Sequence, residues 1–269
     1  MGSPIGHSRS PLLHNYWFKQ HGLAGSYAAV EVKPEGLAAA LRALPAQGYA
    51  GCNLTIPLKQ EAMKIVDEVD TVAKRIGAIS CVIVRPDGKL AGTNNDWYGF
   101  VHNLRQEQPG WRADAGPVVV LGAGGGSRAV CYGLAQEGAR EIRPVTGTFA
   151  RAQAIAREFG EPVKALHWEQ RDDCLEGAAM VVNATSQGMT GQPPLDIRLD
   201  RLGSDTLVAD IIYSPLETPF LAAARKRGNR TVNGLGMLLH QGRPAWKAWF
   251  GIDTEVTPEL RSLLERSLA

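Results

Sequence analysis

The sequence contains no long apolar run and no cysteine pair at metal-binding spacing, and its charges nearly balance. No apolar stretch reaches the roughly 18 residues that a membrane-spanning helix needs. The N-terminus lacks the basic segment followed by an apolar one that marks a secretory signal. We therefore expect a cytoplasmic protein that has no membrane partner.

Charge and cysteine content narrow the chemistry further. The formal net charge is +2 and the basic residues are scattered along the chain, so we expect no nucleic-acid partner. The four cysteines are widely separated, which disfavours both a zinc site and a disulfide framework. We expect no metal site, and we expect free thiols at all four positions: Cys52, Cys81, Cys131 and Cys174.

The second half of the chain shows the clearest secondary-structure pattern. The apolar run 117–121 predicts a buried parallel strand. A helix follows its glycine-rich loop to about residue 137, and the spacing of apolar residues predicts another over 149–159. Further strands are predicted near 141–145, 163–166, 179–183 and 206–212. Strands that alternate with helices predict β-α-β units in an open, doubly wound parallel sheet.

The first half is predicted to be a separate mixture of helices and strands. Its predicted strands are 26–32, 51–55, 78–84 and 89–92, the last two joined as a hairpin through Pro86-Asp87-Gly88. Its predicted helices are 35–44, 57–66 and 95–106. The chain ends in two more predicted helices, 234–249 and 257–268. The overall fold class is therefore α/β.

The loop after the 117–121 strand has the features of a dinucleotide site. It reads Gly122-Ala123-Gly124-Gly125-Gly126-Ser127 and stands between a predicted strand and a predicted helix. Gly122 permits the tight turn, and Gly124 lets the backbone approach a pyrophosphate. The N–H groups at the start of the following helix then face the phosphates. This context is the one that the motif requires, so we predict dinucleotide binding.

The segment after the next strand bears on the choice of dinucleotide. It reads Thr146-Gly147-Thr148-Phe149-Ala150-Arg151. An acid here would bind the ribose 2′-hydroxyl of NAD, whereas an arginine would bind the 2′-phosphate of NADP. The segment has no acid. Arg151 is either a phosphate ligand together with Thr146 and Thr148 or a solvated helix residue.

Polar strings elsewhere in the chain suggest a substrate site. Ser8 and Ser10 present two hydroxyls from one loop, which suits a carboxylate or a diol, and Ser10 before Pro11 also reads as the start of a helix. Four other strings stand at predicted strand ends, where open α/β sheets bind ligands. They are Asn53–Lys59, Gly92–Phe100, Asn183–Met189 and Asp210–Thr218. A last string, Gly234–Gly242, stands near the C-terminus.

In their order and spacing these strings closely resemble the shikimate dehydrogenase family, from residue 2 to about residue 250. The resemblance implies a substrate-binding and catalytic domain over 1–96, a Rossmann domain over 97–232, and C-terminal helices over 233–269 that return to the first domain. It implies hydride transfer between 3-dehydroshikimate and shikimate, with NADP as cofactor and NAD as a possible one. The implied partner is a small cyclic polyol carboxylate, and the protein would be a monomer or a homodimer.

The resemblance also implies residue roles. Lys59 and Asp96 would be the catalytic pair: an amine can accept the hydroxyl proton while the carboxylate orients it, although which of them transfers the proton is open. Substrate contacts are implied for Ser8, Ser10, Thr55, Ser80, Tyr213 and Gln241. Cofactor contacts are implied for Gly122, Ala123, Gly124, Gly125, Thr146, Thr148, Arg151, Thr185, Ser186, Met189, Gly234 and Met237.

Several positions depart from the family pattern. Ser80-Cys81 stands where the family has Asn-Thr, which leaves quinate, aminoshikimate or another cyclic polyol acid as alternative substrates. Gly147 replaces an arginine, and Asn95 replaces a threonine. Relatives also have a strand before Gly2, so either the true start lies upstream or the first sheet lacks a strand. A catalytically weak dinucleotide-binding paralogue is a further alternative, against which the retained Lys59 and Asp96 argue.

Overall fold

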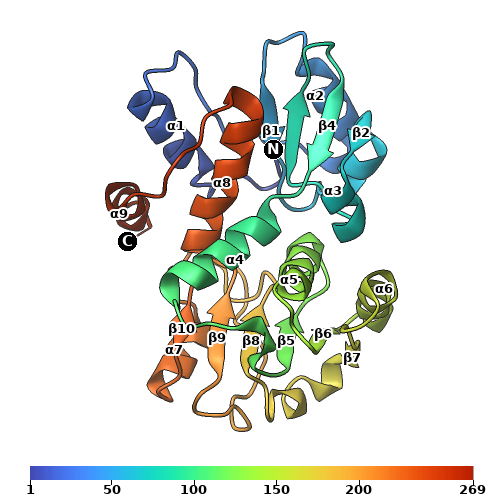
Figure 1. The fold of residues 1–269 in the computed structure, drawn as a ribbon, viewed down its shortest axis with the longest axis vertical. Helices are drawn as coiled ribbons and strands as arrows, with labels where there is room; N and C mark the ends of the chain where they lie inside the picture. The colour runs from blue at the N-terminus through green and yellow to red at the C-terminus, as the bar shows by residue number, and fades with distance from the viewer. Residues whose placement is uncertain (269) are drawn as a thin grey trace. The chain divides into compact units, whose positions relative to one another are not determined.

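The computed structural model describes residues 1–268. The chain forms two compact units, which we describe separately. The first unit contains Met1–Asp96 together with the segment from Leu238 onward, and the second contains Trp97–Met237. The C-terminal segment therefore belongs to the same unit as the N-terminal one, in agreement with the predicted fold class (Figure 1).

The second unit is built on a six-stranded parallel sheet whose strand order is β10-β9-β8-β5-β6-β7. Its strands are β5 (Val118–Leu121), β6 (Ile142–Thr146), β7 (Leu166–His167), β8 (Met180–Asn183), β9 (Leu207–Asp210) and β10 (Thr231–Val232). The strands predicted near 117–121, 141–145, 179–183 and 206–212 are confirmed, whereas the one predicted at 163–166 is found as β7 at its end and β10 was not predicted. The order reverses on either side of β5, and such a switch point leaves a crevice at the carboxyl ends of the strands.

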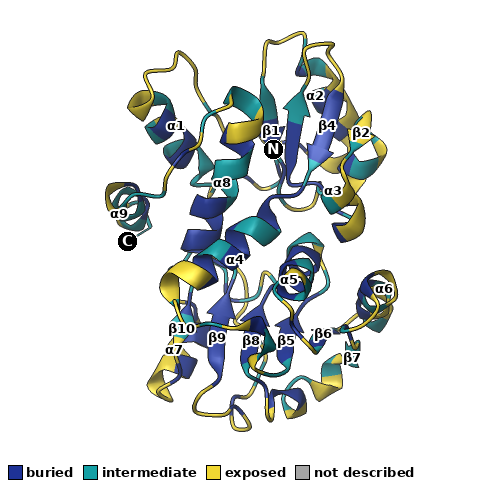
Figure 2. Ribbon diagram, viewed as in Figure 1, coloured by how far each residue is buried: buried dark blue, intermediate teal, exposed yellow. Residues whose placement is uncertain are grey.

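Helices complete the second unit. They are α4 (Asp96–Glu107), α5 (Gly125–Gln136), α6 (Phe149–Phe159) and α7 (Pro219–Lys226), with short 3₁₀ turns at Ala113–Ala115, Trp168–Gln170 and Asp173–Leu175. Helix α6 has the predicted bounds and ends at Gly160, whose φ of 67° suits a glycine. Every residue of β5 is buried, since alternate side chains enter apolar clusters on opposite faces of the sheet (Figure 2).

The first unit contains a four-stranded mixed sheet in the order β1-β3-β4-β2. Its strands are β1 (Gly51–Asn53), β2 (Glu68–Val69), β3 (Cys81–Val84) and β4 (Leu90–Thr93). Strands β3 and β4 pair antiparallel, which confirms the predicted hairpin. Its helices are α1 (Ser10–Gln20), α2 (Leu37–Ala43), α3 (Thr71–Ile76), most of α8 (Leu235–Phe250) and α9 (Pro258–Arg266), with 3₁₀ turns at Pro34–Gly36 and Glu61–Lys64.

Helices α1 and α8 pack together through aromatic rings. Trp17 and Trp246 are fully buried, with ring centroids 5.7 Å apart. The indole N–H of Trp246 donates to Nδ1 of His14 over 2.7 Å, and burial lowers the pKa of His14 to about 3. His14 is therefore a neutral acceptor in the core. This contact fixes the helix that begins at Ser10 against the helix that carries Gln241.

Two predictions for the first unit are wrong. Residues 26–32 form no regular strand, because the side chain of Asn15 hydrogen-bonds both the N–H and the C=O of Tyr27. Only an isolated bridge between Gly2 and Glu31 remains. Residues 57–66 form turns and a 3₁₀ segment rather than an α-helix. There the C=O of Lys59 accepts the N–H of Ile79 over 2.8 Å, in place of an intrahelical bond.

The first residues of the chain lie between two other segments. The N-terminal amine of Met1 donates to the C=O of Asn53 over 2.7 Å, and the N–H of Thr55 donates to the C=O of Met1 over 3.0 Å. On the other side, the N–H of Val32 donates to the C=O of Gly2 over 3.0 Å. The backbone of Met1 and Gly2 is thus hydrogen-bonded. An exposed sheet edge with unpaired backbone had been one of the two expectations from the sequence.

All four cysteines are buried and carry free thiols.

Within residues 1–268, no helix has both the length and the apolar character needed to cross a membrane.

Candidate active site

A buried ion pair occupies the end of β4 in the first unit. Nζ of Lys59 lies 2.5 Å from Oδ2 of Asp96, although the two residues are 37 positions apart. The Asp96 side chain is 1% exposed and that of Lys59 is 16% exposed. A pair with so little solvent is strongly coupled, because water does not screen it. The amine keeps a path to solvent, so a small molecule can reach it.

Two asparagines and Ser80 hold Asp96 in place. The backbone N–H of Asp96 donates to Oδ1 of Asn94 over 3.0 Å, and Nδ2 of Asn94 donates to the C=O of Ala78 over 2.9 Å. The N–H of Asn95 donates to Oγ of Ser80 over 2.8 Å. Together these bonds tie the turn before α4 to the segment that leads into β3. The backbone at Asp96 is therefore held by the buried side chains of Asn94 and Ser80.

Ser80 is buried, and its Oγ is engaged with Asn95 inside the protein. Its C=O accepts the N–H of Leu54 over 2.9 Å and Nδ2 of Asn53 over 3.3 Å. The residue thus links three segments that surround the ion pair. Its side chain supports this framework as an acceptor, and the substrate contact suggested by the sequence stays a prediction.

Tyr27 is a residue of this site that the sequence did not indicate, and Asn53 was indicated only as the first residue of a polar string. The Tyr27 hydroxyl donates to Oδ1 of Asn53 over 2.9 Å and also hydrogen-bonds the side chain of Ser10. Burial raises the pKa of Tyr27 well above its ordinary value of 10.0. A chain of contacts therefore runs from Ser10 through Tyr27 and Asn53 to Ser80. Asn53 opens one of the polar strings, but Tyr27 stands in no motif.

The remaining predicted residues of the first unit lie on its loops and helices. Oγ of Ser8 accepts the N–H of Ser10 over 3.3 Å, so both serines belong to the turn that starts α1. The C=O of Thr55 accepts the N–H of Leu58 over 2.9 Å at the turn before Lys59. Gln241 is half-buried on α8. Thr55 therefore lies in the turn that leads to Lys59, and Ser8 lies in the same turn as Ser10.

The glycine loop of the second unit fits a closely approaching ligand. Gly122 has a φ of 107°, and a Cβ added to it would lie 2.9 Å from both the C=O oxygen of Ala184 and Oγ of Ser127. Gly124 is the N-cap of α5, and nothing lies within 4 Å of an added Cβ. Ala123 and Gly125 flank it. The backbone therefore packs tightly on one side of the loop and is open on the other, as a cradle for a pyrophosphate requires.

The loop after β6 contains the other predicted cofactor residues. Thr146 ends the strand, Thr148 is the N-cap of α6, and Arg151 is exposed in its first turn. Gly147 is exposed, and nothing lies within 4 Å of an added Cβ. The loop therefore has room for a ligand but lacks a guanidinium at position 147.

A buried polar network joins the loops after β8 and β9. Asn183 and Asp210 are the last residues of these paired strands, and Nδ2 of Asn183 lies 3.2 and 3.1 Å from the two carboxylate oxygens. Oδ1 of Asn183 accepts the N–H of Thr185 over 3.1 Å and its hydroxyl over 2.7 Å. The hydroxyl of Thr218 donates to Asp210 over 2.8 Å. The network fixes the loop that carries Thr185, Ser186 and Met189.

Three more predicted residues lie in the loop after β9 or at the start of α8. Tyr213 is half-buried in the loop after β9, and Met237 is buried in the first turn of α8. Gly234 packs on that same loop: a Cβ added to it would lie 2.1 Å from the C=O oxygen of Ile211. Only glycine fits there, so Gly234 allows the start of α8 to pack closely against the loop after β9.

Burial raises the pKa of Asp210 to about 6 from an ordinary value of 3.8, although hydrogen bonds from Ile212, Thr218 and Asn183 act in the opposite direction. Between pH 3.8 and about pH 6 the native state therefore keeps a proton that the unfolded state releases. The stability due to this group is fully present below pH 3.8 and is lost as the pH rises through about 6.

Asp210→Asn removes this titration. We expect the free energy of unfolding of the wild type, minus that of the variant, to fall by about 3 kcal/mol as the pH rises across that window. Urea denaturation at a series of pH values measures this difference, and the other titrating groups cancel in it. A difference that stays constant from about pH 3 to about pH 7, roughly one unit either side of the window, would contradict the assignment.

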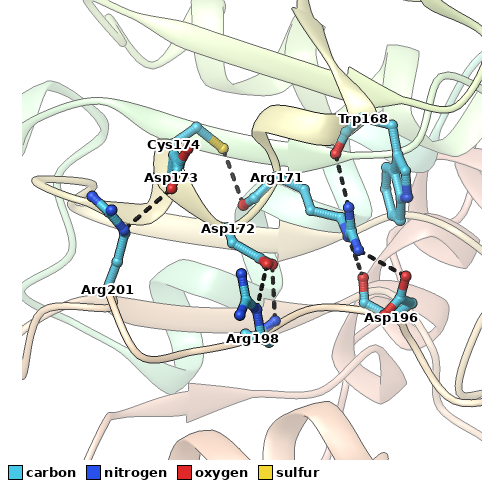
Figure 3. Close-up of polar contacts among 8 residues, drawn as sticks. All are labelled: Trp168, Arg171, Asp172, Asp173, Cys174, Asp196, Arg198 and Arg201. Atoms are coloured by element: carbon cyan, nitrogen blue, oxygen red, sulfur yellow. Dashed lines mark hydrogen bonds and ion pairs between the residues drawn. The ribbon is translucent and has the colours of Figure 1, made fainter.

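Ion pairs hold the rest of the long segment between β8 and β9. Arg171, whose guanidinium lies 5.0 Å from the Trp168 ring centre, pairs with Asp196 over 2.8 Å (Figure 3). Arg198 pairs with Asp172 over 2.8 Å, and the pKa of Asp172 is lowered because hydrogen bonds from Arg198 outweigh its partial burial. Figure 3 also shows Arg201 beside Asp173, at 3.2 Å. These arginines form ion pairs within the protein.

The chain is similar to known proteins along nearly its whole length. Residues 1–82 match the family profile described as the shikimate dehydrogenase substrate binding domain, and residues 106–190 match the one described as shikimate / quinate 5-dehydrogenase. The shikimate dehydrogenase (NADP(+)) of Rhodospirillum rubrum is 49% identical over 266 residues, which cover 97% of this chain and 94% of that protein. The corresponding protein of Nitrobacter hamburgensis is also 49% identical, over 100% of this chain and 93% of its own length.

Solved structures agree. A shikimate dehydrogenase in complex with NADP+ is similar with a TM-score of 0.90 and 36% identity, over 100% of this chain and 94% of that one. The enzyme of Thermus thermophilus, solved with NADP(H) and shikimate, has a TM-score of 0.87 and 34% identity, over 99% and 97%. The quinate dehydrogenase of Corynebacterium glutamicum, solved with NAD, has a TM-score of 0.88 and 31% identity, over 98% and 96%.

Proposed function

Because this chain belongs to the shikimate dehydrogenase family, we propose that it interconverts 3-dehydroshikimate and shikimate by hydride transfer with NADP. The observation that carries the proposal is the buried ion pair of Lys59 and Asp96 at 2.5 Å. A protein that only bound a metabolite would have little need of a desolvated acid–base pair, since burying two charges costs free energy.

Lys59 and Asp96 handle the proton in this proposal. In the oxidation direction a substrate hydroxyl loses its proton to the pair, and in the reduction direction the pair returns it. The two side chains share one short contact, so they act as a unit and not as an independent acid and base. The hydrogen bonds that the backbone N–H groups of Asp96 and Asn95 donate to Asn94 and Ser80 keep the carboxylate aimed at the amine.

The carboxylate of the substrate is bound by Ser8 and Ser10 in this proposal. Their hydroxyls stand at the start of α1, where helical N–H groups favour an anion. Thr55, Gln241 and Tyr213 are proposed to contact the ring hydroxyls. Ser80 is also proposed to contact the substrate, since its Oγ accepts the N–H of Asn95 and keeps its own O–H as a donor.

The proposed cofactor NADP supplies the hydride acceptor at its nicotinamide ring. The fit of the glycine loop supports it: Gly122 admits no side chain, and Gly124 leaves open space at the start of α5. Ala123 and Gly125 complete the pyrophosphate cradle. Thr185, Ser186 and Met189 lie on the loop held by Asn183, and Gly234 and Met237 adjoin the β9 loop; all five are proposed to line the nicotinamide end.

The proposal is tested by steady-state kinetics of the wild-type chain with shikimate and with quinate, each with NADP+ and with NAD+. We expect the highest kcat/KM for shikimate with NADP+. Absence of turnover with all four combinations would contradict the enzyme assignment and favour a binding paralogue.

A second substrate is supported by one observation. Ser80 stands where the family has a longer amide side chain, and its single Oγ already accepts the N–H of Asn95, which leaves fewer polar atoms for the substrate. A kcat/KM for quinate above that for shikimate would favour this alternative. The cytoplasmic location and the monomeric or homodimeric state stay predictions.

A further inference from the structure

The end of β6 has no side chain at the position where an arginine would grip a 2′-phosphate. Gly147 is exposed, with nothing within 4 Å of an added Cβ. Thr146 and Thr148 offer hydroxyls, and Arg151 offers a guanidinium one helical turn further on. Discrimination between dinucleotides with and without a 2′-phosphate needs a directional donor at this strand end. A neighbouring strand can add such a donor to these groups.

The neighbouring strand supplies a candidate. In the parallel pairing of β6 with β7, Thr146 stands opposite His167, so His167 is at the same edge of the sheet. The His167 ring stacks on Phe149, with ring centres 3.6 Å apart and planes 15° apart. Phe149 is the first residue of α6 and directly follows Thr148. The stack therefore joins the end of β7 to the loop after β6.

The other cations of this region are engaged elsewhere. Arg171 follows His167 by four residues and pairs with Asp196, while Arg198 and Arg201, between β8 and β9, pair with Asp172 and Asp173 (Figure 3). Arg143, on β6 itself, pairs with Glu141 over 2.6 Å. Arg151, in contrast, forms no ion pair with the residues that the structure describes. His167 and Arg151 are thus the groups at this edge that an added phosphate can recruit.

We propose that His167, held against Phe149, is a specificity-determining residue for the cofactor and donates a hydrogen bond to the 2′-phosphate of its adenosine. This inference rests on the proposed NADP-dependent function. Imidazole carries an N–H donor in every protonation state, and the donor is directional, unlike a surface ammonium. Stacking on Phe149 restricts the ring before the ligand arrives, so less rotational freedom is lost on binding. Arg151 supplies the full positive charge.

The test compares two ligands that differ only in the 2′-phosphate. The affinities of the full chain for adenosine 2′,5′-bisphosphate and adenosine 5′-monophosphate are measured by titration calorimetry. His167→Ala is expected to weaken binding of the bisphosphate by about 10- to 150-fold, the range for a hydrogen bond to a charged group, and that of the monophosphate by less than about twofold. Phe149→Leu is expected to act in the same direction with a smaller effect.

Two further variants complete the experiment. Arg157→Ala removes an exposed cation from the other end of α6 and is expected to change neither affinity. Gly147→Arg in the His167→Ala background is expected to restore the preference for the bisphosphate, because the position is open. If His167→Ala leaves the ratio of the two affinities at its wild-type value, the inference is wrong. If the wild type itself shows no preference for the bisphosphate, the NADP assignment of the proposed function fails instead.

Discussion

Lys59→Ala is expected to lower kcat by about 10²- to 10⁴-fold, the range attributed to a positioned acid–base group. The affinity for NADP(H) should change little, because Lys59 lies in the first unit and the glycine loop in the second. Steady-state kinetics and a cofactor titration measure the two effects separately. Lys64→Ala is the matched control, since Lys64 is exposed and forms only a surface pair with Glu61. An unchanged kcat in Lys59→Ala would remove Lys59 from the proposed mechanism.

The same substitution leaves the carboxylate of Asp96 buried without its cation, which destabilises a protein by about 3–5 kcal/mol. Loss of activity through unfolding must therefore be distinguished from loss of chemistry. The double variant Lys59→Met with Asp96→Asn removes both charges and keeps most of the side-chain volume. We expect it to regain the thermal stability lost by Lys59→Ala while staying inactive. A double variant that regained activity would show that the charges are not required.

The second large effect is expected for Gly122→Ala. Its Cβ would lie 2.9 Å from both the C=O oxygen of Ala184 and Oγ of Ser127, at a φ of 107° that alanine rarely adopts. We expect a loss of about 1–3 kcal/mol in the free energy of unfolding, together with a loss of at least about tenfold in NADP(H) affinity because the loop must shift. Urea denaturation and a fluorescence titration of NADPH measure these effects.

Gly124→Ala separates the two consequences. Its added Cβ meets nothing within 4 Å, so the free energy of unfolding should stay close to that of the wild type while NADP(H) affinity falls. Gly110→Ala, at an exposed position with equally open space, should change neither property. If Gly124→Ala binds NADPH as tightly as the wild type, the pyrophosphate does not lie against this loop.

The second unit could be predicted from sequence because its signals are local. The apolar run at 117–121, the glycines after it and the spacing of Ala152, Ile155 and Phe159 each report on neighbours along the chain. The strand order and the switch point follow once the β-α-β rule applies. The bounds of α6 agree with the prediction, because both of its ends are set by local residues.

The first unit was predicted less well because its backbone follows distant contacts. Asn15 takes the backbone groups of Tyr27, and Ile79 takes the C=O of Lys59. Neither contact leaves a periodic trace in the sequence. The pairing of Lys59 with Asp96 was likewise expected from the family resemblance and not from spacing. Tyr27 and the structural use of Ser80 were visible only in the fold.

In the proposed reaction this chain oxidises shikimate with NADP+, and Lys59 and Asp96 handle the proton. The most direct test is the rate of NADPH formation from shikimate, measured side by side for the wild type and for the Lys59→Met, Asp96→Asn double variant. We expect steady turnover by the wild type and a rate at least about 10²-fold lower for a variant that is folded and still binds NADPH. A folded double variant with the wild-type rate, or a wild type that forms no NADPH, would contradict it.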